Sequence, residues 1–231
     1  MPTVLITGSS RGLGLEFARQ YAQAGWRVHA SCPNPDAADA LNAVARSASA
    51  TVAIHRLDVT DHEQISALAK ALEGEPIDVL LNNAGVYGGQ HRAFGTTDYV
   101  QWEVALRVNV LGPMRMAEAF ADRVAASARR LIVCLSSRLG SIAANEAGGS
   151  YAYRSSKAAL NAVVKSLAVD LRDRGITVVA LHPGWVATDM GGAGAPMKPA
   201  ESVGAMRSTI DRLAPAATGT FVDYDGVEIP W

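Results

Sequence analysis

The sequence has little of what marks secreted, membrane-spanning or nucleic-acid-binding proteins. Its two cysteines, Cys32 and Cys134, lack CxxC or metal-ligand spacing, which favours buried free thiols in a reducing compartment and predicts no metal site. No apolar run approaches the roughly 18 residues that a membrane span needs, and the N-terminus has no signal-peptide pattern. The formal net charge of −1 provides no basic field for nucleic acid or lipid. We therefore expect a soluble cytoplasmic protein without nucleic-acid or membrane partners.

What the chain does have is a regular alternation of short apolar runs and longer amphipathic stretches. The apolar runs are nearly continuous, as in parallel strands that are buried on both faces. They cover residues 3–7, 26–31, 51–57, 77–83, 130–137, 176–184 and 219–224. Helical patterns occupy 15–23, 36–46, 61–72, 97–126, 151–173 and 201–213. The alternation predicts the α/β class: one Rossmann-fold domain over residues 1–231, a doubly wound parallel sheet of about seven strands with helices on both faces.

A glycine-rich turn, "TGSSRGLG", joins the first predicted strand to the first helix. Its glycines, Gly8, Gly12 and Gly14, follow the spacing GxxxGxG. Small residues permit a tight turn and let backbone N–H groups approach a pyrophosphate at the positive end of the helix. The turn therefore predicts a dinucleotide site, with a purely structural turn as the alternative.

The residues after the second strand favour NADP(H), with NAD(H) as the alternative. Sites for NAD usually place an acid there for the ribose 2′-OH, but Ser31, Cys32 and Pro33 provide none, and the nearest acid is Asp36. Arg11, inside the glycine turn, has a guanidinium that suits a 2′-phosphate. Asp58, after the third strand, is expected either to reach the adenine edge or to cap a helix.

The stretch "YAYRSSK" places Tyr153 four residues before Lys157. Residues at this spacing share one face of a helix. A fixed ammonium favours the phenolate and lowers the pKa of the phenol toward the range that suits general acid/base catalysis. The alternative is an exposed helical turn with a coincidental pair.

Further motifs occur in a fixed order along the chain. They are "TGxxxGxG" at 7–14, "NNAG" at 82–85, the asparagine of "RVNVLGP" at 109, "SS" at 136–137, "YxxxK" at 153–157 and "HPGWVATDM" at 182–190. Together they resemble the short-chain dehydrogenase/reductase family over essentially the whole chain. The segments "SSRLGSIA" and "DYDGVEIPW" resemble its sniffer-type carbonyl reductases and bacterial C-factor proteins.

The resemblance implies four catalytic residues. Tyr153 is the expected general acid for reduction and base for oxidation, and Lys157 is expected to lower its pKa and hold the nicotinamide ribose. Ser137 is expected to bind the substrate carbonyl, and Asn109 to interrupt its helix and hold a water that relays protons to Lys157. The cofactor-binding residues that it implies are Gly8, Ser10, Arg11, Gly12, Leu13, Gly14, Asp58, Val59, Asn83, Ala84, Gly85, Tyr153, Lys157, Pro183, Gly184, Val186 and Thr188.

The same resemblance implies an enzyme that interconverts a carbonyl and an alcohol by hydride transfer. The loops at 86–96 and 190–200 are expected to cover a small or medium apolar substrate. The two long helices, at 97–126 and 151–173, are expected to pair copies into a homodimer or homotetramer. One departure concerns the cofactor, because Pro33 stands where NADP-type members often carry an arginine. The alternative function is a catalytically lapsed dinucleotide-binding sensor or C-factor-like signalling protein.

Overall fold

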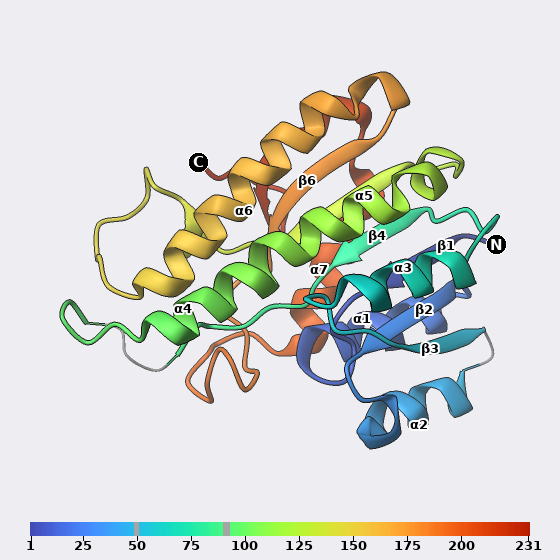
Figure 1. Ribbon diagram of the computed structural model, residues 1–231, viewed down its shortest axis with the longest axis horizontal. Helices are drawn as coiled ribbons and strands as arrows, with labels where there is room; N and C mark the ends of the chain where they lie inside the picture. The colour runs from blue at the N-terminus through green and yellow to red at the C-terminus, as the bar shows by residue number, and fades with distance from the viewer. Residues whose placement is uncertain (49–50, 90–92) are drawn as a thin grey trace.

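The computed structural model of the chain, shown in Figure 1, describes residues 1–48, 51–89 and 93–231. Its seven strands form one parallel sheet in the order β3-β2-β1-β4-β5-β6-β7. The strands are β1 (Thr3–Ile6), β2 (Arg27–Cys32), β3 (Val52–Arg56), β4 (Val79–Asn82), β5 (Leu131–Leu135), β6 (Thr177–His182) and β7 (Phe221–Asp223). The predicted parallel sheet is thus confirmed, with strands somewhat shorter than the apolar runs.

Helices cover both faces of the sheet, as the alternation predicts. They are α1 (Gly12–Gln23), α2 (Asp39–Ser47), α3 (His62–Ala71), α4 (Tyr99–Leu106), α5 (Gly112–Ala125), α6 (Tyr151–Asp170) and α7 (Pro199–Arg212). A π-helical turn, Arg107–Leu111, joins α4 to α5 without a break, so the predicted long helix at 97–126 is nearly correct. The predicted helix at 36–46 is instead a 3-10 turn, Pro35–Ala37, followed by α2.

The ends of the helices follow from local chemistry. Asp61 caps α3, because its carboxylate accepts hydrogen bonds from the backbone N–H groups of Glu63 and Gln64. Helix α6 ends at Asp170, and a 3-10 turn, Arg172–Arg174, extends it to Gly175. Gly175 has a φ of +68°, a left-handed conformation that glycine adopts easily and that ends the helical segment where its sequence predicts.

The apolar core has two layers, one on each face of the sheet. Buried side chains of α3, α5 and α6 pack on one face, among them Ile65, Phe120 and Val164. Buried side chains of α1, α2 and α7 pack on the other. Figure 1 shows α5 and α6 crossing the near face of the sheet, with α1 and α7 behind it. Both faces of the central strands are therefore covered, which explains why their sequences are apolar without alternation.

The topology determines where a ligand can bind. All strands are parallel, so their carboxyl ends lie at one edge of the sheet. Strand β1 pairs with β2 on one side and with β4 on the other, so the connections turn in opposite directions at β1. Ligands of such sheets bind in the crevice at this switch point. The residues that follow β1 and β4 are therefore expected to form its walls.

Two further observations concern the cysteines and the helices. Cys32 and Cys134 are both buried and free, as predicted. No helix among residues 1–48, 51–89 and 93–231 combines the length and apolar character needed to cross a membrane.

Candidate functional site

A cleft of about 420 Å³ lies at the carboxyl ends of the strands. Of the residues predicted to bind the cofactor, the cleft is lined by Gly8, Ser10, Arg11, Gly12, Leu13, Gly14, Asp58, Val59, Asn83, Ala84, Gly85, Tyr153, Lys157, Pro183 and Thr188. Gly184, Val186, Asn109 and Ser137 are not part of that lining. Segments that are distant in sequence thus converge on one elongated site.

Thr7 and Asn83 tie the end of β1 to the end of β4. The Thr7 hydroxyl accepts hydrogen bonds from the backbone N–H groups of Asn83 and Ala84, each at 3.0 Å. In return, the Asn83 side-chain amide donates to the carbonyl groups of Thr7 and Gly8 at 2.7 and 2.9 Å. These bonds hold the two walls of the cleft at a fixed separation.

The glycine turn leaves no room for larger side chains. A Cβ atom on Gly14 would lie 2.2 Å from the Gly8 carbonyl oxygen and 2.5 Å from the Asn83 amide nitrogen. Gly12 has a φ of +57°, and a Cβ there would project toward Thr188, whose nearest atom is 3.7 Å away. Gly14 therefore permits the close approach of the turn to Asn83, whereas at Gly12 it is the left-handed backbone that favours glycine.

Helix α6 brings Tyr153 and Lys157 to the other end of the cleft. Both side chains are almost completely buried, and the Lys157 Nζ lies 5.8 Å from the centroid of the Tyr153 ring. The ammonium donates a hydrogen bond to the carbonyl oxygen of Leu135, the last residue of β5, at 2.8 Å. The helical spacing therefore places the pair side by side, as the sequence predicts.

Burial shifts the pKa values of these two groups in opposite directions. Burial raises the pKa of Tyr153 to about 12, although a hydrogen bond with the Ser137 side chain lowers it. Burial lowers the pKa of Lys157 to about 8. The expected lowering of the Tyr153 pKa by Lys157 is absent, because loss of hydration outweighs other effects on the phenol and the ammonium is directed at the Leu135 carbonyl.

Ser137 follows β5 and lies beside Tyr153. Its hydroxyl accepts a hydrogen bond from the backbone N–H of Leu139 at 3.2 Å, so it caps the short turn after the strand. The same side chain lowers the pKa of the Tyr153 phenol, although less than burial raises it. The structural and functional interpretations of Ser137 are therefore compatible.

Asn109 occupies the π-helical turn between α4 and α5 and is fully buried. Its amide oxygen accepts from the backbone N–H of Val86 at 2.9 Å, and its amide nitrogen donates to the Val86 carbonyl at 2.8 Å. The nitrogen also donates to the Ser156 hydroxyl at 2.9 Å. The regular α-helical geometry gives way to a π-helical turn at Asn109, and this side chain clamps the chain that leaves β4.

Arg11 and Asp58 line the cleft from the segments that follow β1 and β3. Arg11 forms an exposed ion pair with Asp189, with a separation of 2.6 Å. One carboxylate oxygen of Asp58 accepts hydrogen bonds from the backbone and the side chain of Thr60. Asp58 thus lines the cleft and stabilises a turn, but it does not cap a helix, because the N-cap of α3 is Asp61.

Sequence reasoning missed Tyr87. Its ring stacks on that of Tyr153, with centroids 4.5 Å apart and an angle of 8° between the planes. Its hydroxyl also lies 3.0 Å from that of Ser150, directly before α6. The only signal in the sequence is an aromatic residue two positions after "NNAG".

The structure describes only part of the loops that were predicted to cover the substrate. Residues 90–92 of the loop at 86–96 lie outside the described residues. In the second segment, the Trp185 indole donates to the Gly191 carbonyl at 2.9 Å, and Trp185 and Met190 are 60% and 42% exposed. These side chains offer apolar surface beside the Tyr153 end of the cleft, where Met190 contributes to the lining.

Comparison with known proteins agrees with this geometry. The family model for short chain dehydrogenases matches residues 2–198. The chain belongs to the short-chain dehydrogenase family. The chain is also 48% identical to the C-signal protein of Myxococcus xanthus over 156 residues, 68% of this chain and 93% of that one.

Solved structures of this short-chain dehydrogenase family extend the similarity to the full chain. The carbonyl reductase Sniffer of D. melanogaster is 35% identical and superposes with a TM-score of 0.93, with all of both chains covered. An NADPH-bound carbonyl reductase from chicken fatty liver is 30% identical with a TM-score of 0.92, covering 100% of this chain and 99% of that one. The predicted resemblance to sniffer-type and C-factor proteins is confirmed.

The cleft fits the nicotinamide dinucleotide that short-chain dehydrogenases use. The glycine turn at the N-terminus of α1 and Thr188 both line the cleft, and a helix N-terminus of this kind suits a pyrophosphate. The cleft then continues to Tyr153 and Lys157. Among the described residues, no group of three or more His, Cys, Asp or Glu side chains is arranged to hold a metal ion.

We predict that Thr7→Val lowers the free energy of unfolding by about 1–3 kcal/mol, because two partly buried N–H groups lose their acceptor. Urea denaturation measures the change, and Thr7→Ser, which keeps the hydroxyl, should remain close to the original protein. A Thr7→Val protein as stable as the original would show that these bonds do not join the two walls.

Proposed function

We propose that the protein is an NADP(H)-dependent oxidoreductase that interconverts a carbonyl and an alcohol on a small or medium apolar substrate. In this proposal residues 1–231 act as one catalytic domain. The observation that carries it is the pair of buried side chains Tyr153 and Lys157, with the Lys157 Nζ 5.8 Å from the Tyr153 ring, in the lining of a dinucleotide-sized cleft. The carbonyl reductases that resemble the chain over its whole length support the same reaction class.

The cofactor would lie along the cleft from the glycine turn to α6. The turn and the N-terminus of α1 would hold the pyrophosphate, and Arg11 would face the 2′-phosphate. Asp58 and Val59 would border the adenine, while Asn83, Ala84 and Gly85 would form the floor. Pro183, Gly184, Val186 and Thr188 would border the nicotinamide and the adjoining phosphate. The NADPH bound to the chicken carbonyl reductase supports the choice of cofactor.

Tyr153 and Ser137 would act together on the substrate oxygen. The nicotinamide, when bound, supplies or accepts the hydride at the substrate carbon. During reduction, the Ser137 hydroxyl donates a hydrogen bond to the carbonyl oxygen and stabilises the negative charge that develops there. Tyr153 transfers its phenolic proton to that oxygen, and in oxidation it removes the proton from the alcohol. A pKa of about 12 keeps the phenol protonated at neutral pH, which suits reduction.

Lys157 and Asn109 would support this proton transfer. The Lys157 ammonium would hold the nicotinamide ribose and would also stabilise the phenolate that remains after the proton has left. Asn109 would fix the chain at Val86 and hold a water that connects Lys157 to solvent. Its amide oxygen approaches the same space as the Lys157 Nζ, since a Cβ on Gly85 would lie 3.3 Å from the oxygen and 3.6 Å from the Nζ.

The second candidate is a dinucleotide-binding sensor or signalling protein without turnover. The 48% identity to the C-signal protein of Myxococcus xanthus favours it. Against it, all four positions of the implied catalytic set are filled, and Tyr153, Ser137 and Lys157 lie together. A panel of aldehydes, ketones and quinones with NADPH, followed by nicotinamide absorbance, separates the two. Tight cofactor binding with no turnover across the panel would favour the sensor.

With a carbonyl substrate from this panel, we predict that Tyr153→Phe lowers kcat by about 10²–10⁴-fold, because the general acid is removed. The Kd for NADPH should stay within about twofold of the original value, since the ring and its packing remain. Tyr151→Phe is the matched control, because Tyr151 is 40% exposed and lies in the same helical turn. Near-full turnover by Tyr153→Phe would exclude this residue as the proton donor.

We also predict a pH dependence that arises from Lys157. Burial lowers the pKa of its amine to about 8, so the ammonium is present below that pH and is lost above it. The kcat/KM for reduction should therefore be level near neutral pH and fall as pH rises through about 8. Initial rates between pH 6 and 10 measure this profile. A level profile up to pH 10 would contradict the role of the ammonium.

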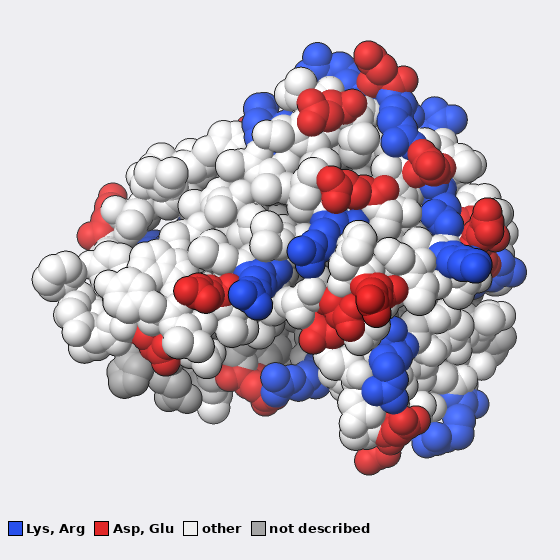
Figure 2. Space-filling view, in the orientation of Figure 1, with Lys and Arg blue, Asp and Glu red and all other residues white. Residues whose placement is uncertain are grey.

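We also propose that the protein forms a homodimer, or a homotetramer built from such dimers. Val100 and Val104 on α4 and Val169 on α6 are 69%, 37% and 52% exposed. Figure 2 shows most charged side chains of this face over its upper and right-hand parts, while the first half of α6 is largely uncharged. Exposed apolar surface on adjoining helices suits a second copy of the chain.

Light scattering should accordingly give at least twice the 24.2 kDa mass of one chain. Val100→Lys should lower the mass, because it places a charge within the apolar surface. Val227→Lys is the control, since Val227 is 62% exposed and lies outside these helices. A monomeric mass for the unmodified protein would overturn the homodimer.

A further inference from the structure

The structure places an arginine from the third strand beside the residues that follow the second strand, where the sequence itself has no arginine. Arg56 is the last residue of β3 and is in register with Cys32, the last residue of β2. Its guanidinium donates a hydrogen bond to the Pro33 carbonyl oxygen at 3.3 Å. Pro33 stands where NADP-type members of the family often carry an arginine, and the structure brings a guanidinium to this point from the neighbouring strand.

The guanidinium contacts a residue of the cleft wall at the end that would hold the adenosine. Pro33, whose carbonyl accepts from Arg56, lines the cleft, and so does Leu57, the residue after Arg56. In folds of this class the ribose of the adenosine lies against the residues that follow the second strand. The 2′-position of the cofactor is therefore within the surroundings of Arg56.

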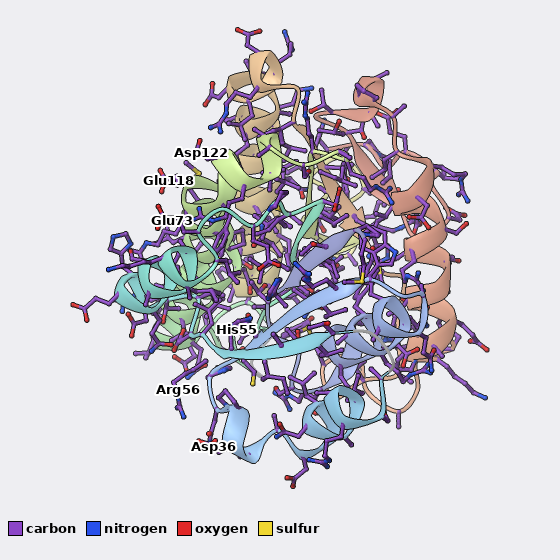
Figure 3. All side chains as sticks on the ribbon, turned by 90° about the vertical axis from the view of Figure 1, so that its right-hand side faces the viewer. Asp36, His55, Arg56, Glu73, Glu118 and Asp122 are labelled. Carbon is purple, nitrogen blue, oxygen red and sulfur yellow. The ribbon has the colours of Figure 1, made fainter. Side chains whose placement is uncertain are left out.

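The ion pair that holds the Arg56 side chain is exposed to solvent and therefore weak. Its guanidinium forms an ion pair with Asp36 at 3.1 Å, and the two side chains are 56% and 87% exposed. Figure 3 shows Arg56 and Asp36 near one another at the β3 edge of the molecule. An ion pair this exposed is screened by water and salt, so a doubly charged phosphate can replace the carboxylate.

Arg11, which lines the cleft, has a similar arrangement. Arg11 is paired with Asp189, and these side chains are 78% and 75% exposed. Each arginine is thus oriented by a solvent-exposed acid while its guanidinium remains accessible. Such a planar group can form two parallel hydrogen bonds with a phosphate.

We propose that Arg56 is the residue that selects the 2′-phosphate, and that Asp36 moderates this selection as a competing anion. The assignment rests on the proposed function, because it requires an adenine dinucleotide in the cleft. Arg56 exchanges the Asp36 carboxylate for the 2′-phosphate, with Arg11 as a second contact. When the ligand has a 2′-hydroxyl instead, the ion pair with Asp36 remains intact.

Isothermal titration calorimetry with two fragments of the cofactor tests this assignment without any turnover. The probes are 2′,5′-ADP, which has the 2′-phosphate, and 5′-AMP, which lacks it. Arg56→Ala should weaken 2′,5′-ADP binding about 10- to 100-fold and change 5′-AMP binding less than twofold. Asp36→Asn should strengthen 2′,5′-ADP binding several-fold, because the competing carboxylate is removed.

Arg172→Ala is the charge-matched control, since Arg172 is exposed and lies in the turn that precedes β6, near the amino ends of the strands. It should leave both affinities unchanged. Thermal unfolding of each variant verifies that the fold is retained. The loss caused by Arg56→Ala should also shrink as salt is raised, because the interaction is ionic.

Several outcomes would overturn the assignment. If Arg56→Ala binds 2′,5′-ADP as tightly as the original protein, or weakens both probes equally, Arg56 does not read the 2′-phosphate. If the original protein binds both probes with equal affinity, the cleft accepts adenine nucleotides but does not select the phosphate, and only this inference fails. If it binds neither probe nor NADPH, the proposed function fails as well.

Discussion

Four hydrogen bonds between the segments that follow β1 and β4 determine the shape of the cleft. Two of them join Thr7 and Asn83, one runs from the Asn83 amide to the Gly8 carbonyl, and one from the Ala84 N–H to the Thr7 hydroxyl. The bonds join the two strands at which the connections change direction, the point where a doubly wound sheet opens. These hydrogen bonds satisfy polar groups at the closed base of the crevice. The glycine turn and the "NNAG" segment can therefore face each other across the crevice. The proposed binding of the pyrophosphate and the nicotinamide depends on this separation.

Burial controls the chemistry at the other end of the cleft. The same loss of hydration raises the pKa of Tyr153 and lowers that of Lys157, since it disfavours the charged form of each. In the structure the lysine is directed at the Leu135 carbonyl, so its charge does not act mainly on the phenol. The simple expectation that an adjacent ammonium lowers the pKa of Tyr153 therefore omits the larger effect. The phenol therefore keeps its proton at neutral pH, and the hydroxyl of Ser137 is the group that lowers its pKa.

The sequence predicted those features of the fold and the site that depend on local patterns. Continuous apolar runs predict buried parallel strands, and the spacing of Tyr153 and Lys157 predicts a common helical face. Arg56 could not be found in this way, because its position beside Pro33 depends on the order and register of β2 and β3. Tyr87 was missed for a related reason, since its stacking on Tyr153 joins two segments that are far apart in the chain.

The start of α6 shows how such long-range contacts position the catalytic residues. Gly148, Gly149 and Ser150 have successive φ values of +62°, +64° and +47°. The first two suit glycine, whereas a left-handed serine costs about 1–3 kcal/mol and persists only where its surroundings hold it. The hydroxyl of Tyr87 lies within hydrogen-bonding distance of the Ser150 side chain, while the Tyr87 ring covers that of Tyr153. One aromatic side chain therefore stabilises both the point at which the helix begins and the orientation of the phenol three residues later.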